Sequence, residues 1–149
     1  MRPALRFADV HSGDQIPAVA LPITYTRVCQ NAAATLDWMP GHHDPRYARA
    51  QGQETIYLST LFFTGFVDRC VTEWAGPGAF IRRRCITMTT PIYAGETATA
   101  SGHVTGLRTK DGRRLVDADV VVSSERGPCV TAEVTIELPH ERRSSGGAR

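Results

Sequence analysis

Residues 54–76 read ETIYLSTLFFTGFVDRCVTEWAG, the longest stretch of helical character in the chain. Its apolar residues at 58, 61, 62, 66, 70 and 74 fall on one stripe of a helix, which Phe63 and Val67 widen. A helix that is apolar around so much of its circumference is usually largely buried. Gly76-Pro77-Gly78 should end it. The stretch therefore predicts one long helix in the middle of the fold.

The periodicity changes on the C-terminal side of this helix. Segments rich in Val, Ile and Thr alternate in part and are separated by turn signals, which is typical of strands. They predict four strands, at 81–89, 97–109, 114–124 and 129–139. Asp111-Gly112 favours a hairpin, since glycine adopts positive φ without strain. One buried helix followed by a four-strand antiparallel meander predicts an α+β fold in which the sheet wraps around the helix.

The N-terminal side carries shorter elements. The pattern predicts an arm over 1–18 and a strand over 21–28. A short helix should follow, with Thr26 as its N-cap because a threonine hydroxyl accepts from the free amides of a first turn. That helix should end near Asp37, since Pro40-Gly41 follows.

Length and charge narrow the class of protein. The chain has 149 residues, the size of one domain, which we expect over 1–139 with a polar, disordered tail over 140–149. The 17 basic and 15 acidic residues leave a net charge of +2, which argues against a nucleic-acid partner. The four cysteines show no zinc-binding spacing, and the sequence shows neither a signal peptide nor a membrane-spanning stretch. A cytoplasmic, reduced protein is predicted.

The segment with the strongest chemical character is DWMPGHHDP, from Asp37 to Pro45. An aspartate and a histidine in hydrogen-bonding range can divide acid and base roles around one water molecule, with no metal. Pro40-Gly41 would turn the chain so that Asp37 faces His42. On the residues alone, the alternative is a solvated turn in which Asp37 caps a helix and the histidines lie at the surface.

This segment resembles the motif D-x-N-P-x-H-x-D-P of the MaoC-like (R)-specific enoyl-CoA hydratases. The matching residues are Asp37, Pro40, His42, Asp44 and Pro45. Three further segments resemble parts of the same family in the same order, namely LRFADVHSGDQIP (5–17), AGPGAFI (75–81) and PIYAGETATASGHVT (91–105). The resemblance implies a single hot-dog fold, a long helix wrapped by a curved antiparallel sheet. It also implies a homodimer or a heteromer with a second MaoC-like subunit.

A narrower likeness is to the small MaoC-like subunits of the enoyl-CoA hydratases of bacterial steroid side-chain degradation. It rests on HHD at 42–44, AQG at 50–52 and TEWAGP at 72–77. The chain departs from the wider family at two places. Met39 stands where the family has Asn, and Tyr57-Leu58-Ser59 stands where it has Ala/Val-His-Gly. The small subunits share both departures, so neither need mean inactivity.

The resemblance implies a lyase that hydrates 2-enoyl-CoA thioesters, or dehydrates 3-hydroxyacyl thioesters in reverse. Asp37 and His42 would hold the water, with His42 as the base, although the opposite assignment stays open. The backbone amide of Ser59, at the start of the long helix, would bind the thioester oxyanion. No cofactor is implied, because CoA is part of the substrate.

Two further pairs of residues are candidate substrate contacts. Arg82 and Arg84 should share one face of a strand and could bind the phosphates of CoA. Phe62 and Phe63 could form an apolar wall for a bulky, steroid-type acyl chain. The alternatives are a solvated strand edge for the arginines and the core for the phenylalanines.

Other functions stay open at this point. Met39 and Ser59 would also suit a non-catalytic, thioester-binding subunit of a hetero-oligomer, and a tailoring dehydratase of polyketide biosynthesis would carry the same motif. A hot-dog thioesterase is less favoured, because its usual acid lies on the long helix, where Asp68 and Glu73 lie too near the end. The acyl chain, the choice between CoA and a carrier protein, and the direction of reaction are not determined by these residues.

Overall fold

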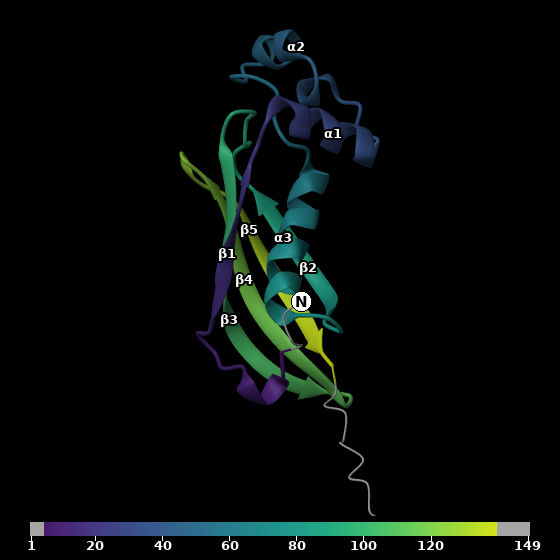
Figure 1. Cartoon of the computed structure of the whole chain (residues 1–149), viewed down its shortest axis with the longest axis vertical. Helices are drawn as coiled ribbons and strands as arrows, with labels where there is room; N and C mark the ends of the chain where they lie inside the picture. The colour runs from purple at the N-terminus through teal and green to yellow at the C-terminus, as the bar shows by residue number, and fades with distance from the viewer. Residues whose placement is uncertain (1–4, 140–149) are drawn as a thin grey trace, which may run out of the picture.

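The computed structural model describes residues 5–139, which form one antiparallel sheet curved around a long helix (Figure 1). The predicted tail over 140–149 lies outside the described residues. The strands are β1 (Gln15–Pro22), β2 (Phe80–Met88), β3 (Thr97–Lys110), β4 (Arg113–Ser124) and β5 (Gly127–Leu138). The helices are α1 (Tyr25–Thr35), α2 (Pro45–Ala50) and α3 (Thr60–Ala75), with 3₁₀ turns at Phe7–Asp9 and Pro40–His42. This is the predicted α+β, hot-dog arrangement.

The strand order in the sheet is β1-β3-β4-β5-β2, with every neighbouring pair antiparallel. The meander is confirmed for β3, β4 and β5, and the tight turn between β3 and β4 has positive φ at both Asp111 and Gly112. The prediction that β2 opens the meander is wrong, because β2 pairs with β5 instead. Strand β1 already occupies the free edge of β3, so the edge of β5 is the one left for β2.

The N-terminal elements differ from the prediction. Strand β1 pairs with β3 from Gln15 to Pro22, so it begins inside the predicted arm, and the strand expected over 21–28 is wrong beyond its first two residues. Helix α1 begins at Tyr25, and its N-cap is Thr24, whose hydroxyl accepts from the amide of Arg27 at 3.1 Å. Thr26 therefore lies in the first turn and is not the cap. The antiparallel pairing with β3 decides where the strand lies, and local propensity could not anticipate it.

The core lies between the concave face of the sheet and α3. Phe63, Val67 and Val71 of the helix are fully buried and face strand residues such as Val120 and Ile136 in one continuous apolar cluster. Burying a side chain of this size contributes roughly 1.5–3 kcal/mol. Helices α1 and α2 lie together beyond the N-terminal end of α3 (Figure 1). No helix of residues 5–139 is long and apolar enough to cross a membrane.

A bulge in β2 changes the faces of its arginines. The register with β5 shifts just after Ile81, so the alternation of side chains is interrupted there. Arg82 forms an ion pair with Glu137, on the face of β5 turned away from the helix, whereas Arg84 forms one with Asp68 of α3. The prediction that Arg82 and Arg84 share a face is therefore wrong. It assumed an uninterrupted two-residue period.

Candidate active site

The end of α1 sets the direction of Asp37. Leu36 caps the helix in the left-handed conformation (φ 55°), and its amide donates to the carbonyl of Ala33 at 3.3 Å. The amide of Asp37 donates to the carbonyl of Ala32 at 3.0 Å. A branched residue rarely adopts positive φ, so these closing hydrogen bonds hold a strained turn. The turn directs the chain, and with it Asp37, toward the 3₁₀ turn at Pro40–His42.

That 3₁₀ turn is packed tightly against the segment before α3. The carbonyl of Gly41 accepts from the amide of Tyr57 at 3.3 Å, and the amide of Gly41 donates to the Met39 sulfur at 3.0 Å. A Cβ atom at Gly41 would lie 2.7 Å from the Tyr57 hydroxyl oxygen, a separation that real Cβ atoms essentially never show. A larger residue at position 41 would therefore displace the side chain of Tyr57 or Met39, or the turn itself.

The turn brings Asp37 and His42 together. Nε2 of His42 lies 3.4 Å from Oδ2 of Asp37, and Nδ1 of His42 lies 2.7 Å from the carbonyl oxygen of Tyr57. A carbonyl only accepts, so Nδ1 carries the proton and Nε2 of the neutral ring keeps its lone pair. The side chain of His42 is 6% exposed and that of Asp37 30%. The arrangement holds a buried imidazole in the tautomer that can accept a proton at Nε2, beside a carboxylate that reaches solvent.

The neighbouring histidine and acid do not join this pair. The carboxylate of Asp44 caps α2, accepting from the amides of Arg46 at 2.8 Å and Tyr47 at 3.3 Å. These bonds, the one from Tyr47 foremost, hold the pKa of Asp44 below its usual value, so it stays charged as a cap. His43 is exposed. Asp44 is therefore a helix cap, and the pair of Asp37 and His42 stands without it.

The N-terminus of α3 lies next to the histidine. Ser59 is the N-cap residue and is buried, and its hydroxyl donates to Oδ1 of Asn31 at 2.8 Å. Its side chain is therefore engaged with α1, while its backbone amide has no hydrogen-bond partner among residues 5–139. A free amide at a helix N-terminus, where the dipole is positive, suits a developing negative charge.

A pocket of about 320 Å³ opens on His42. The residues that line it are Met39, His42, Gln53, Tyr57, Leu58, Thr60, Met88, Thr89, Thr90 and Pro91. Apart from the histidine, none of them is ionisable near neutral pH, and burial raises the pKa of the Tyr57 hydroxyl, which therefore stays protonated. No group of three or more potential metal ligands occurs in the described part of the chain.

Sequence reasoning missed several of these residues. Tyr57 contacts His42 through its backbone carbonyl, a group that every residue has, so the residue type could not predict the contact. Asn31 accepts a hydrogen bond from Ser59, which lies 28 residues further along the chain. Gln53 lines the pocket without belonging to any motif. Only the folded chain could assign these three contacts.

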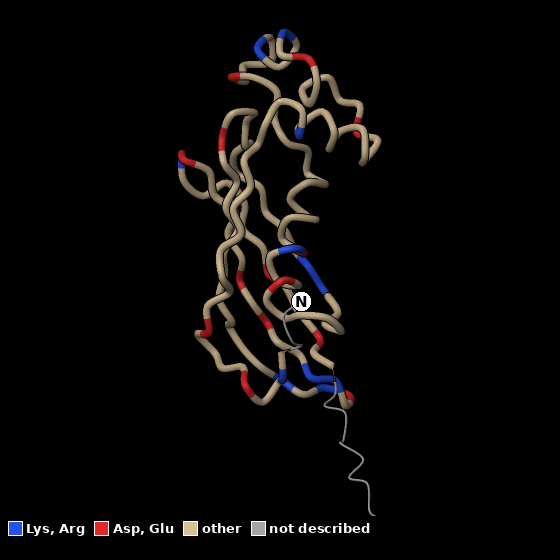
Figure 2. Tube along the Cα trace, in the orientation of Figure 1, with Lys and Arg blue, Asp and Glu red and all other residues tan. Residues whose placement is uncertain are grey.

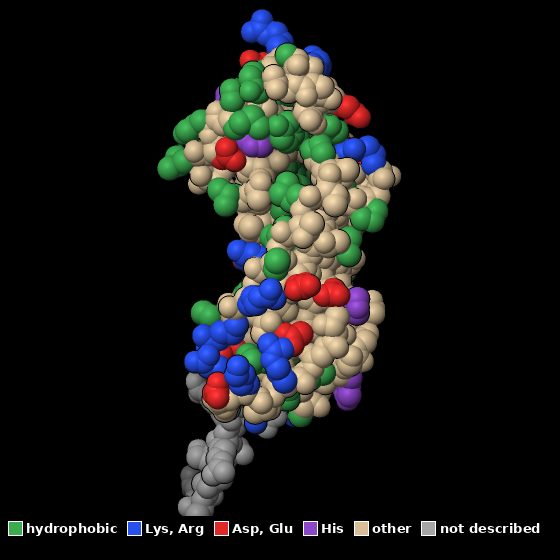
Figure 3. Space-filling model, turned by 180° about the vertical axis from the view of Figure 1, so that it is seen from behind, with side chains coloured by type: hydrophobic (Ala, Val, Ile, Leu, Met, Phe, Trp, Pro, Cys, Tyr) green, Lys and Arg blue, Asp and Glu red, His purple; other side chains and the backbone are tan. Residues whose placement is uncertain are grey.

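The remaining predicted residues lie away from the pocket lining. Phe63 is fully buried in the core, and the ring of Phe62 packs on Phe66 with centroids 5.4 Å apart. Arg82 and Arg84 lie along β2, in the half of the molecule where most basic residues gather, and both are already ion-paired (Figure 2). Hydrophobic side chains instead gather around the end formed by α1 and α2 (Figure 3). Roles for these four residues in substrate binding stay predictions.

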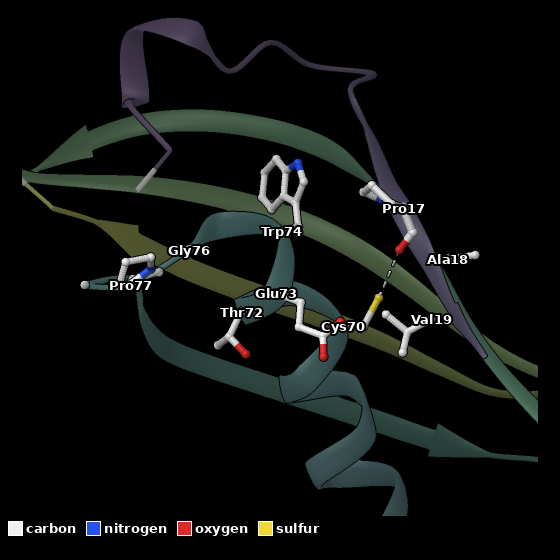
Figure 4. Close-up of a pocket in the computed structure, with 11 residues that line it drawn as sticks. Pro17, Ala18, Val19, Cys70, Thr72, Glu73, Trp74, Gly76 and Pro77 are labelled. Atoms are coloured by element: carbon white, nitrogen blue, oxygen red, sulfur yellow. Dashed lines mark hydrogen bonds between the residues drawn. The ribbon is translucent and has the colours of Figure 1, made fainter. Parts of the chain in front are cut away.

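A second, larger hollow of about 630 Å³ lies at the other end of α3, between that end and β1 (Figure 4). Its wall includes Pro17, Cys70, Glu73 and Trp74. We call it the Trp74 groove. The thiol of Cys70 is buried, and the loss of hydration raises its pKa to about 11. Glu73 forms an ion pair with Arg69 at 2.7 Å.

Comparison with known proteins places the chain in a family. The family model described as "MaoC like domain" matches residues 7–126, so the chain belongs to the MaoC-like family. The resemblance read from residues 37–45 is thereby confirmed, together with the hot-dog fold.

Relatives of known name share much of the chain. It is 38% identical over 126 residues to the 3-oxo-4,17-pregnadiene-20-carboxyl-CoA hydratase beta subunit of Mycobacterium tuberculosis, covering 85% of this chain and 95% of that protein. It is 28% identical over 102 residues to the (R)-specific enoyl-CoA hydratase of Rhodospirillum rubrum, covering 68% and 70%.

Solved structures agree on the fold. A chain of the ChsH1-ChsH2 complex from Mycobacterium tuberculosis matches with a TM-score of 0.80 and 37% identity, covering 87% of this chain and 98% of that one. The (R)-hydratase from A. caviae involved in PHA biosynthesis matches with the same TM-score at 20% identity, covering 88% and 98%. At 20% identity, the second match supports the fold and no statement about function.

Proposed function

We propose that this chain adds water across the C2=C3 double bond of 2-enoyl thioesters, or removes it in the reverse direction. The observation that carries the proposal is the geometry of His42, whose Nε2 faces Asp37 at 3.4 Å while Nδ1 is held by the Tyr57 carbonyl. A base with a fixed tautomer beside a carboxylate can position and deprotonate one water molecule. Membership of the MaoC-like family supports the same reaction class.

The proton balance follows from this pair. A water molecule that hydrogen-bonds to both Asp37 and His42 forms a bond from its oxygen to C3, while Nε2 of His42 takes one of its protons. The electrons of the double bond move toward the thioester carbonyl, and C2 then receives a proton from the pair. The net change is addition of OH at C3 and H at C2, and the enzyme returns to its starting state. No further reactant is needed.

The negative charge that develops on the thioester oxygen needs a hydrogen-bond donor to stabilise it. The unpaired amide of Ser59, at the positive end of α3, is the group we assign to it. One such donor is typically worth about 3 kcal/mol of transition-state stabilisation. The Ser59 hydroxyl donates to Asn31, so the side chain does not occupy the backbone amide, which stays available to the thioester oxygen.

We propose that the acyl group is bulky and steroid-type and that the chain works with a second MaoC-like subunit. The support is the relative from Mycobacterium tuberculosis, which is named as a hydratase of a pregnadiene carboxyl-CoA and as a beta subunit. The match to a chain of the ChsH1-ChsH2 complex points in the same direction.

A second candidate is a thioester-binding subunit without its own turnover. Met39 favours it, because a thioether stands where the family motif has a polar asparagine, one residue from the turn that holds His42. In that case the partner subunit would carry the acid–base pair.

Loss of enoyl-thioester ultraviolet absorbance tests both candidates, with the chain alone and with any subunit that co-purifies. We expect turnover by the wild type and a fall of about 100-fold or more in Asp37→Asn and in His42→Ala. His43→Ala, at the exposed neighbouring histidine, is the matched control and should keep full activity. Activity that survived both changes would overturn the assignment, and absence of wild-type turnover in either form would favour the second candidate.

A further inference from the structure

The carboxamide of Gln53 is held in one orientation at the wall of the His42 pocket. The hydroxyl of Tyr93 donates to Oε1 of Gln53 at 2.6 Å. Tyr93 is itself fixed, since it is 7% exposed and the guanidinium of Arg126 lies 4.8 Å from its ring centroid. Arg126 is paired in turn with Glu96. A phenol hydroxyl that donates to Oε1 leaves the NH₂ group of Gln53 pointing away from Tyr93.

That NH₂ group has no partner among residues 5–139. Gln53 is half-buried and lines the same pocket as His42. The hydroxyls of Thr60 and Thr90, two exposed residues in the lining, have no partner in the described part of the chain either. Such groups bind water, which a ligand that offers equivalent hydrogen bonds can displace. The pocket thus offers several unused hydrogen-bond groups within one small volume.

The rest of the lining selects the chemistry of the ligand. None of the ten lining residues is Asp, Glu, Lys or Arg, which makes the pocket unsuited to a phosphate. Met39, Leu58 and Met88 supply apolar surface. The hydrocarbon that adjoins the thioester in an acyl group has no hydrogen-bond acceptors, whereas the pantetheine arm on its other side is neutral and carries two amide carbonyls. A side-chain carboxamide is a natural donor to such a carbonyl.

We infer that Gln53 is a substrate-binding residue whose NH₂ group, oriented by Tyr93, donates to an amide carbonyl of the pantetheine arm. This inference rests on the proposed function, because it assumes a thioester in the His42 pocket. Tyr93 is a positioning residue, acting only through Gln53. The effect falls on KM, since the bond is made equally in the ground state and the transition state.

The test compares substrates with and without the arm, using the chain together with any subunit that co-purifies. Gln53→Glu keeps an oxygen that accepts from Tyr93 but loses the donor, so it should raise KM for an enoyl-CoA about tenfold with kcat within about twofold. For an enoyl S-ethyl thioester, which has no amide, kcat/KM should not change. Tyr93→Phe should raise KM for the enoyl-CoA by about threefold. Gln51→Ala, at an exposed neighbouring residue, is the control and should match the wild type.

Equal losses with both substrates, or no loss with the enoyl-CoA, would overturn the inference. CoA and an acyl carrier protein both carry the pantetheine arm. The natural substrate is the enoyl thioester, of CoA or of the carrier protein, that the wild type turns over. If the wild type hydrates no thioester, the proposed function fails, but calorimetric binding of CoA still decides the inference. Weaker binding by Gln53→Glu than by Gln51→Ala would support it, and equal binding would overturn it.

Discussion

The two ends of α3 lie beside hollows of opposite character. The N-terminal end lies at the His42 pocket of about 320 Å³, and the C-terminal end at the Trp74 groove of about 630 Å³. The larger hollow has fewer reactive groups, because the Cys70 thiol stays protonated and the Glu73 carboxylate is ion-paired. The smaller one is lined by an oriented imidazole, with the Asp37 carboxylate and the N-terminal end of α3 beside it. The orientation of these polar groups, and not the volume of the hollow, is therefore the basis on which we propose the His42 pocket as the active site.

We expect the largest effect on activity from disturbing the turn that holds His42 while leaving the imidazole and the carboxylate in place. Gly41→Ala puts a Cβ atom 2.7 Å from the Tyr57 hydroxyl oxygen, so the turn or the side chain of Tyr57, whose carbonyl holds His42, must shift. A displacement of about 1 Å of a catalytic group can cost about 100-fold in rate. We therefore expect kcat/KM to fall by about 100-fold while circular dichroism shows an intact fold.

Gly65→Ala is the control for that substitution. Gly65 lies exposed in the middle of α3 with open space around its Cβ position, so alanine should raise the free energy of unfolding by about 0.5–1 kcal/mol. Its activity should stay at the wild-type level. Full activity in Gly41→Ala would show that the turn tolerates the shift and would remove the argument for tight positioning.

At the C-terminal end of α3, we expect a substitution to lower stability and to leave activity unchanged. Trp74→Ala removes a half-buried side chain that packs on the core, which should lower the free energy of unfolding by about 3 kcal/mol. Urea denaturation measures that change. Hydratase activity below the unfolding transition should stay within about twofold of the wild type. A tenfold fall in activity would assign the Trp74 groove a part in the reaction.

The same groove should make the protein sensitive to alkali. Burial raises the pKa of the Cys70 thiol from an ordinary 9.0 to about 11. The unfolded chain releases this proton first as the pH rises, so the thiol's contribution to stability is complete below pH 9 and is lost between about 9 and 11. The loss should be on the order of 2 kcal/mol. We expect the denaturation midpoint, measured from pH 7 to 11, to fall less with pH in Cys70→Ala than in the wild type. Cys29→Ala, at an exposed thiol, should show the same pH dependence as the wild type.

The smallest effect is expected on β2. Arg84→Met breaks the partly exposed pair with Asp68 and should lower the free energy of unfolding by about 1 kcal/mol. Because the pair already occupies the guanidinium, KM for an enoyl-CoA should change little. A several-fold rise in KM that disappears at high salt would instead favour the phosphate-binding role predicted from the sequence.

The fold was predictable wherever it depends on local pattern. The buried helix, four of the strands at nearly their final bounds, and the turn at Asp111-Gly112 follow from periodicity and glycine chemistry. The position of β2 in the sheet did not follow, because pairing depends on which strand edge is free. The bulge after Ile81 is also a property of pairing, and it moved Arg82 and Arg84 to opposite faces.

The family, the helix-and-sheet class and the spacing that lets Asp37 approach His42 could all be predicted from the amino-acid sequence. Residue types, their periods and their spacing carry that information. The tertiary structure alone decided which imidazole nitrogen keeps its lone pair, since a backbone carbonyl, at Tyr57, accepts the other proton. It also decided the orientation of the Gln53 carboxamide, through Tyr93 forty residues away. Such partners come from distant segments that only folding brings within hydrogen-bonding distance.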